Sequence, residues 1–180
     1  THSLVATLEF SRDRKSMSVI TTRPDAPPAD SPSRSSRDGA GYSLFVKGAP
    51  ESVLARCDKV LIAGGAEVPL SSQLREAIEE AVERLAGGAS ALRCLACALR
   101  HGLPTAPSAL PLRDPSKFAQ IESGLTLVGI VGLRDPPRPE VSTAIDTCRQ
   151  AGIRVVCITG DNPATAAALC RSVGILSPHH

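Results

Sequence analysis

The chain has 180 residues, of which 42% are hydrophobic, and its 20 basic residues nearly balance its 18 acidic residues, for a net charge of +2. This length fits one large domain or two small ones, and the apolar share is enough to bury a core. Balanced charge and an aromatic content of only 2% argue against nucleic acid as a partner. The sequence contains no run of about 20 apolar residues, so it predicts no transmembrane helix. The six cysteines are expected to be free thiols in a reducing compartment.

The first segments of the chain predict an antiparallel arrangement. Residues 4–10 and 16–21 are expected to form two strands around a charged turn, and residues 42–47 a third strand. Residues 22–41 contain four prolines, several serines and charges that cancel, and this composition predicts a mobile surface loop.

The middle of the chain alternates between helix and strand. A proline predicts the start of a short helix over residues 50–57, and residues 58–62 have the pattern of a strand. The clearest helix runs from residue 74 to 85, where apolar residues recur at spacings of three and four after two serines that can cap its start. A strand over residues 91–99 and a proline-rich loop over residues 101–116 follow.

The last third has a different pattern. Residues 125–131 and 153–158 are almost wholly apolar, as in strands buried on both faces, and helices are predicted over residues 139–151 and 162–173. Strand, helix, strand and helix joined by short links indicate parallel pairing with a right-handed crossover.

This change of pattern predicts a domain boundary near residue 122. Residues 1–122 are expected to form an α+β domain, an antiparallel sheet with helices that carries the flexible loop 22–41. Residues 123–180 are expected to form a partial α/β piece of Rossmann-like type.

Polar residues follow the predicted strand at 153–158. Thr159, Gly160, Asp161 and Asn162 lie between that strand and the next helix. Ligands of parallel sheets bind at the carboxyl ends of strands, and the free N–H groups of a helix N-terminus favour anions, so a phosphate site is one interpretation. The alternative is that Asp161 or Asn162 only caps the helix.

Lys47 and Gly48 also end a predicted strand. The ammonium group could face an open nucleotide pocket, or it could simply be solvated before a turn. The sequence contains neither a Walker loop nor a dinucleotide-binding glycine motif. Cys94 and Cys97 form a C-x-x-C match, but residues three apart on a strand point to opposite faces and no second pair completes a zinc site, so we predict no metal site.

Six segments occur in a fixed order and carry a combined signal: TLEFSRDRKSMSV (7–19), FVKGAPE (45–51), LRCLA (92–96), DPPR (135–138), CRQAGIRV (148–155) and ITGDN (158–162). Together they resemble the P-type cation-transporting ATPases, most closely the calcium pumps of the sarco/endoplasmic-reticulum type, over about residues 4–176. KGAPE and TGDN mark the family broadly, whereas the FSRDRKSMSV string favours the calcium branch.

The resemblance implies an ATP site with Mg²⁺ as cofactor. Phe10 would stack on the adenine ring, Lys47 would line the deep end of the same pocket with Lys15 near it, and Gly48 would give room. The residues implied around the phosphates are Arg12, Arg93, Thr159, Gly160 and Asp161, the last three in a haloacid-dehalogenase-like phosphorylation domain. Asp135 is implied at the hinge side, where it helps to position Mg²⁺ and phosphate.

The departures from the family pattern imply a fragment. The D-K-T-G-T and T-G-D-G-x-N-D motifs, the membrane helices and the actuator domain do not occur in these 180 residues. The acidic residue expected to bond the adenine amino group would lie upstream of Thr1. We therefore expect residues 1–122 to be most of the nucleotide-binding domain and residues 123–180 part of the phosphorylation domain, with the latter less stable because its sheet lacks strands.

The implied partners are ATP and the remaining domains of the same pump, with most Mg²⁺ ligands outside the chain and calcium as the transported ion. The segment itself is expected to be soluble and cytoplasmic, in a membrane protein of endoplasmic-reticulum type. Without the aspartate nucleophile it is not expected to hydrolyse ATP.

Two alternatives belong to other classes. A free-standing haloacid-dehalogenase-like phosphatase would use the 159–161 motif, although it needs a D-x-D-x-[TV] string that the sequence does not contain. A non-catalytic nucleotide-binding or regulatory fragment is the other. ATP affinity separates the pump segment from a purely regulatory fragment, and phosphatase turnover with Mg²⁺ would support the phosphatase.

Overall fold

The computed structural model describes residues 2–22, 41–87, 92–134, 136–160 and 163–177. Most of the predicted loop 22–41 lies outside these residues, as do Asp135 and Asp161. The chain divides into two compact units, which are described separately. The first, here called the sheet unit, comprises Thr1–Arg75 and Leu95–Val131, and the second, here called the helical unit, comprises Glu76–Cys94 and Gly132–His180.

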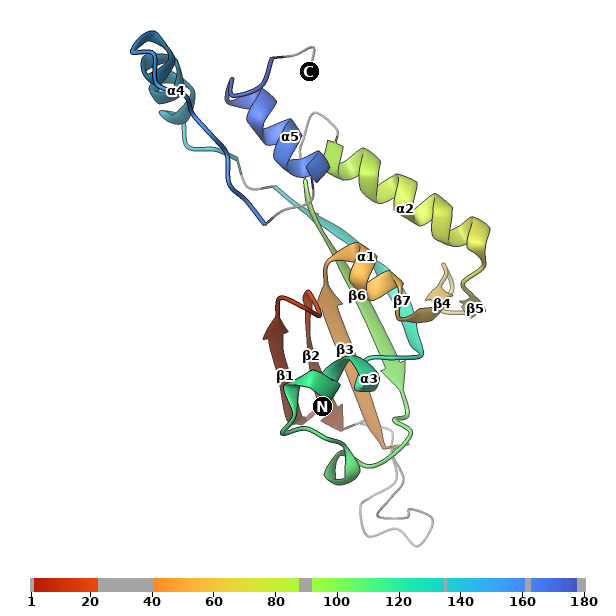
Figure 1. The fold of residues 1–180 in the computed structure, drawn as a ribbon. Coiled ribbons are helices and arrows are strands. Elements are labelled where there is room, and N and C mark those ends of the chain that lie inside the picture. Colours follow the sequence, from red (N-terminus) through yellow and green to blue (C-terminus); the bar gives the residue numbers. More distant parts are fainter. Residues whose placement is uncertain (1, 23–40, 88–91, 135, 161–162, 178–180) are drawn as a thin grey trace, which may run out of the picture. The chain divides into compact units, whose positions relative to one another are not determined.

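A seven-stranded sheet with the order β1-β2-β3-β6-β7-β4-β5 forms the sheet unit (Figure 1). Its strands are β1 Leu4–Ser11, β2 Ser16–Thr22, β3 Tyr42–Gly48, β4 Cys57–Leu61, β5 Glu67–Pro69, β6 Arg93–His101 and β7 Leu125–Leu133. The pairs β1–β2, β2–β3, β3–β6 and β4–β5 are antiparallel, whereas β4 and β7 are parallel. The α+β class is confirmed, but the sheet is mixed and not purely antiparallel.

Two short helices cover one face of this sheet. They are α1, Pro50–Leu54, which begins with a proline as predicted, and α3, Phe118–Ile121, which the sequence pattern did not indicate (Figure 1). Alternation along the strands places apolar and small side chains on the covered face, since neighbouring side chains point to opposite sides. The buried strand residues on this face include Leu8, Ser18, Ile20, Leu44 and Val46.

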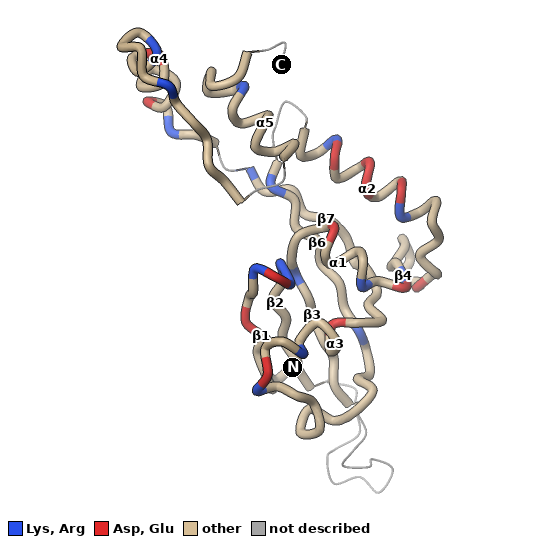
Figure 2. The backbone as a smooth tube through the Cα atoms, viewed as in Figure 1, with Lys and Arg blue, Asp and Glu red and all other residues tan. Residues whose placement is uncertain are grey.

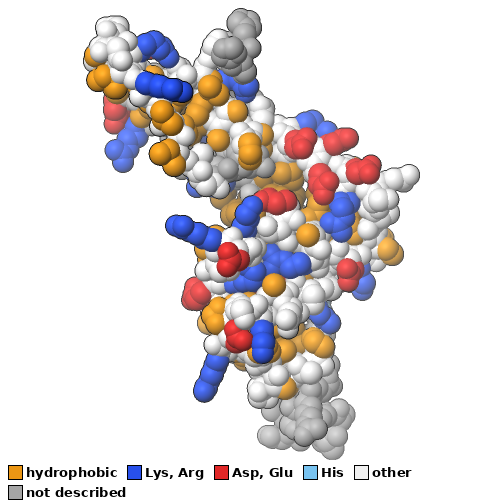
Figure 3. Space-filling model, viewed as in Figure 1, with side chains coloured by type: hydrophobic (Ala, Val, Ile, Leu, Met, Phe, Trp, Pro, Cys, Tyr) orange, Lys and Arg blue, Asp and Glu red, His pale blue; other side chains and the backbone are white. Residues whose placement is uncertain are grey.

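The helical unit contains most of α2, Ser72–Gly87, and all of α4, Val141–Gln150, and α5, Pro163–Ser172. Ser71 caps α2 by accepting a hydrogen bond from the Leu74 N–H at 3.2 Å, which agrees with the predicted helix start. Acidic side chains of α2 lie on its exposed surface (Figure 3). No helix in the described part of the chain is long and apolar enough to cross a bilayer.

The predicted strand over residues 153–158 is wrong. This segment has no regular secondary structure, and Ile158 is 94% exposed. A strand buried on both faces needs hydrogen-bonded neighbours, and within the described residues no strand pairs with this segment. β7 is a strand as predicted, but only its first three residues are buried, where it pairs with β4.

The parallel β-α-β arrangement expected after residue 122 is therefore not seen among the described residues, although both predicted helices form. β7 continues the sheet of the preceding strands, because Leu125 and Leu127 are in register with Cys57 and Val60. The domain boundary at residue 122 stays a prediction.

Candidate functional site

A bulge in β1 determines the direction of the Phe10 side chain. Leu8 pairs with Ser18 and Ser11 pairs with Ser16, so three steps along β1 match two steps along β2. The extra residue leaves Glu9 and Phe10 both opposite Met17. Leu8 and Ser11 stay on the face that α1 and α3 cover, and Phe10 is placed on the other face, where 62% of it is exposed.

Phe10 begins a row of side chains that crosses four strands on the open face. The register places Met17 of β2 beside Lys47 of β3, and Lys47 beside Cys97 of β6. Phe10 and Lys47 are exposed, whereas Met17 between them and Cys97 at the end of the row are half-buried. Two residues that the sequence assigned to one nucleotide pocket therefore share a face, with the thioether of Met17 between them. The sequence pattern alone does not indicate a role for Met17.

Such a row suits a flat aromatic ligand that carries negative charge. An exposed aromatic ring and a thioether offer apolar contact to a purine, and an ammonium group at the edge can meet its polar rim or a phosphate. The residues present therefore fit an adenine nucleotide.

The turn between β1 and β2 carries the densest charge near this face. Arg12, Asp13, Arg14 and Lys15 follow one another there, and Figure 2 shows the resulting basic tip. The Nζ of Lys15 lies 3.1 Å from Oε1 of Glu51, and both side chains are exposed. Lys15 adopts a φ of +50°, the left-handed conformation that closes this turn.

Gly48 is required by packing beneath that turn. A Cβ at this position would lie 2.4 Å from the carbonyl oxygen of Lys15 and 2.8 Å from the Cα of Ser16, both backbone atoms. The next residue, Ala49, donates its N–H to the same carbonyl oxygen at 2.9 Å. The absence of a side chain at Gly48 thus lets the end of β3 lie against the β1–β2 turn.

The other predicted site residues lie in the helical unit. Arg93 is the exposed first residue of β6, and Thr159 and Gly160 are exposed just before α5. Asp135 and Asp161 lie outside the described residues. The sheet unit contains the five remaining site residues, which are Phe10, Arg12, Lys15, Lys47 and Gly48. The structure thus brings Phe10 and Lys47 together in one row and Lys15 and Gly48 together at one turn.

A buried carboxylate lies behind the turn and was missed by the sequence analysis. Glu122 has 0% exposure and follows α3 directly. Its carboxylate accepts hydrogen bonds from four side chains: Arg14, Ser16, Ser18 and Arg56. Arg14 and Ser16 lie more than 100 residues from Glu122 in sequence, so no local pattern indicates this cluster.

No group of three or more potential metal ligands occurs among the described residues. The residues seen here therefore offer no ready-made set of carboxylates for Mg²⁺. The described cysteines are free thiols. Burial raises the pKa of the Cys57 thiol to about 11, and the nearby cations of Arg75 and Arg56 only partly oppose this effect.

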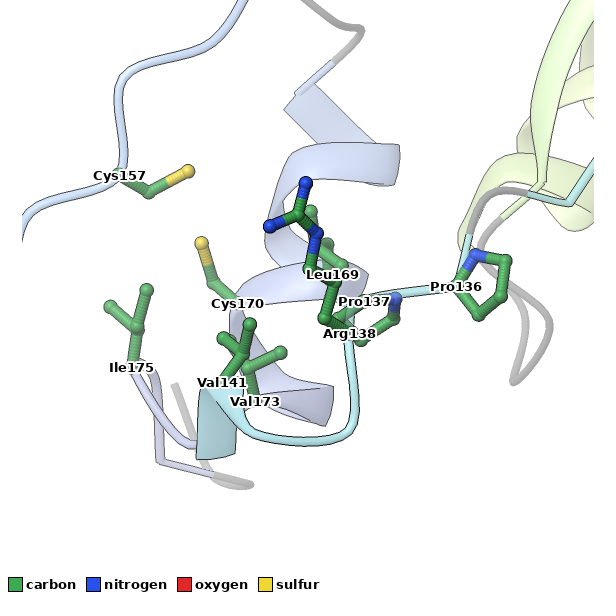
Figure 4. A pocket seen from close by; sticks show the side chains of 9 residues that line it. All are labelled: Pro136, Pro137, Arg138, Val141, Cys157, Leu169, Cys170, Val173 and Ile175. Atoms are coloured by element: carbon green, nitrogen blue, oxygen red, sulfur yellow. The ribbon is translucent and has the colours of Figure 1, made fainter. Parts of the chain in front are cut away.

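An open apolar groove of about 360 Å³ lies within the helical unit (Figure 4). Cys157 from the segment 153–158 and Cys170 from α5 direct their sulfur atoms toward one another across it. The other lining residues are Pro, Val, Leu and Ile, together with Arg138. The groove offers little polarity for a nucleotide and marks apolar surface that the described strands do not cover.

A comparison with protein families agrees with the geometry of the sheet unit. The model of the P-type ATPase cytoplasmic domain N matches residues 1–140, that is 140 of the 180 residues. The match contains the row from Phe10 to Cys97, the charged turn and Glu122, and it ends before Thr159. The chain therefore belongs to the P-type ATPase family, in which it represents the cytoplasmic N domain that binds nucleotide.

Proposed function

We propose that the chain binds ATP on the open face of its sheet and acts as the ATP-binding segment of a calcium-transporting P-type pump. The observation that carries this proposal is the row of Phe10, Met17 and Lys47 on one face, which the β1 bulge makes possible. The adenine ring would stack on Phe10 and contact Met17, with the Lys47 ammonium at its edge.

The phosphates would then extend toward basic side chains. Arg12 is exposed on the turn next to Phe10, and Lys15 can exchange its exposed ion pair with Glu51 for a phosphate, since exposed pairs contribute little. Arg93 belongs to the helical unit, and its assignment to the phosphates rests on the LRCLA segment over residues 92–96 alone. Gly48 contributes indirectly by allowing the turn to pack against β3.

Phosphoryl transfer needs residues beyond this face. The chain would present the terminal phosphate to an aspartate in another part of the pump, and this transfer would power ion movement. Thr159, Gly160 and Asp161 would lie beside the transferred group, and Asp135 would help to position Mg²⁺. The FSRDRKSMSV string over residues 10–19 supports the calcium branch and hence an endoplasmic-reticulum-type membrane for the full protein.

An ATP titration by calorimetry tests the proposal. We expect Phe10→Ala and Lys47→Ala each to weaken binding by at least about tenfold, the scale of one lost stacking or charge-assisted contact. Leu4→Ala and Lys59→Ala are matched controls, because both residues are exposed and lie away from the row, Leu4 at the far end of β1 and Lys59 on β4. A folded parent chain that does not bind ATP would overturn the proposal.

Two further measurements address the finer points. Incubation of the chain with ATP or phosphate esters and Mg²⁺ should release no phosphate, and turnover would favour a phosphatase. In membranes that contain the full-length protein, ATP hydrolysis should depend on calcium, and dependence on another cation would remove the calcium assignment while leaving the nucleotide site intact.

A further inference from the structure

The Glu122 cluster connects the covered face of the sheet to the candidate nucleotide site. Oε1 of Glu122 accepts a hydrogen bond from Arg14 and one from the Ser18 hydroxyl at 2.7 Å, and Oε2 accepts one from Arg56 and one from the Ser16 hydroxyl at 2.9 Å. Two guanidinium groups therefore share one fully buried carboxylate. Removal of its charge would leave two cations facing each other in a desolvated place.

Arg14 connects Glu122 to the bulge in β1. Its second terminal nitrogen donates to the carbonyl oxygen of Glu9, which is one of the two bulge residues opposite Met17. Its guanidinium also lies over the ring of Phe118, 5.1 Å from the ring centre. One side chain thus joins α3, Glu122 and the backbone next to Phe10.

Arg56 connects Glu122 to the other side of the β1–β2 turn. It donates to the carbonyl oxygen of Arg14 at 3.1 Å and to the Ser16 hydroxyl at 3.1 Å. The backbone is consequently held at Glu9 and at Arg14, the two ends of the segment that includes Phe10 and Arg12 and precedes Lys15 directly.

We propose that Glu122 is a positioning residue for nucleotide binding: through Arg14 and Arg56 it fixes the β1 bulge and the β1–β2 turn, and with them Phe10, Arg12 and Lys15. This proposal rests on the proposed function, because it needs those three side chains to contact ATP. Glu122 itself lies on the covered face of the sheet, bonded to Ser16 and Ser18, and acts only through its two arginines.

The experiment compares variants of the 180-residue chain that differ in which buried hydrogen bonds they lose. Glu122→Gln keeps the shape of the side chain but loses its charge, and Arg14→Lys cannot span Glu9 and Glu122 with a planar fork. The matched control is Arg75→Gln, because Arg75 is also a partly buried arginine of the sheet unit, but it donates to Leu54 and Cys57 and not to the turn.

All three variants are expected to lower the denaturant midpoint, so stability alone does not test the proposal. ATP affinity, measured under conditions where each variant is folded, should fall about tenfold in Glu122→Gln and about fivefold in Arg14→Lys, the scale of lost charge-assisted hydrogen bonds, and should stay unchanged in Arg75→Gln. Without ATP, the amide signals of residues 9–15 should shift in the first two variants, while those of β4 and β5 stay in place.

Unchanged ATP affinity in folded Glu122→Gln and Arg14→Lys would overturn this proposal and leave the proposed function standing. An equal loss of affinity in Arg75→Gln would also overturn it, because the effect would then follow general destabilisation. A parent chain without ATP binding would remove the proposed function and this proposal together. If Glu122→Gln does not fold, Arg14→Lys and the milder Ser18→Ala, which removes one bond to Oε1, decide the outcome in the same way.

Discussion

The sheet unit and the helical unit use similar apolar sequences with different results. In the sheet unit, strands distant in sequence pair with each other and bury side chains such as Leu44 and Leu125 completely. In the helical unit, α4 and α5 form from local hydrogen bonds, but Ile153, Val156 and Ile158 stay exposed. Helices need only their own segment, whereas an apolar strand is buried only where neighbouring strands and a covering layer exist.

The largest contrast should come from truncating one large apolar residue in each unit. Leu44→Ala removes a fully buried side chain from β3 and is expected to cost about 3 kcal/mol of unfolding free energy. Ile158→Ala removes a side chain that is already in contact with water and should change stability by less than about 0.5 kcal/mol. Urea unfolding followed by circular dichroism measures both values. Equal losses would show that residues 153–158 are packed in solution.

Hydrogen exchange gives the second contrast. Amides of β2 and β3 should exchange at least about a hundredfold more slowly than those of α4 and α5, because the strands lie inside the larger buried core. The first residues of β7 should follow the sheet, since they pair with β4. Equal protection of both groups would contradict the difference in stability that we infer between the two units.

Alanine substitutions at two glycines, one in each unit, should give a smaller difference in stability. Gly48→Ala places a Cβ against backbone atoms of Lys15 and Ser16, and we expect it to cost about 2 kcal/mol and to weaken ATP binding. Gly160→Ala meets no described atom within 4 Å and should leave stability unchanged. Thermal melts and the ATP titration check the pair. A neutral Gly48→Ala would mean that the turn does not pack on β3 in solution.

Cysteine labelling should show the smallest contrast. At pH 8 a thiol reagent should modify the exposed Cys157 at least about tenfold faster than the buried Cys57, because the thiolate is the reacting form. Burial raises the pKa of Cys57 from 9.0 to about 11 in the folded chain, so its contribution to stability is intact below pH 9 and is lost as the pH rises to about 11. Cys57→Ala should remove this part of the alkaline dependence. Equal labelling rates would mean that β4 opens readily.

Much of the secondary structure could be predicted from local patterns. The hairpin of β1 and β2, the strand β3, the proline-initiated α1 and the capped α2 all occur where periodicity and turn residues place them. β5 and α3 have only three and four residues, too few for a period to be visible. The segment 153–158 has the composition of a buried strand, but composition does not supply the neighbours that a strand requires.

The candidate site could be predicted in part. Phe10 and Lys47 were identified through motifs, and the register then showed that they share a face. Met17 is an ordinary apolar residue in its strand, and only its place between the two reveals a possible role. Glu122 is a single acidic residue before an apolar strand, and its partners become visible only when distant segments meet.

The bulge also makes the length of the first hairpin as important as its composition. Along each strand, successive side chains alternate between the two faces of the sheet. One additional residue in β1 moves every later side chain of that strand to the opposite face. Strict alternation from Leu8 without the bulge would pair Phe10 with Ser16 and turn the aromatic ring toward α1 and α3, even though every motif residue was still present. For this protein, the letters of the motif therefore determine the face of Phe10 only together with the pairing of the hairpin.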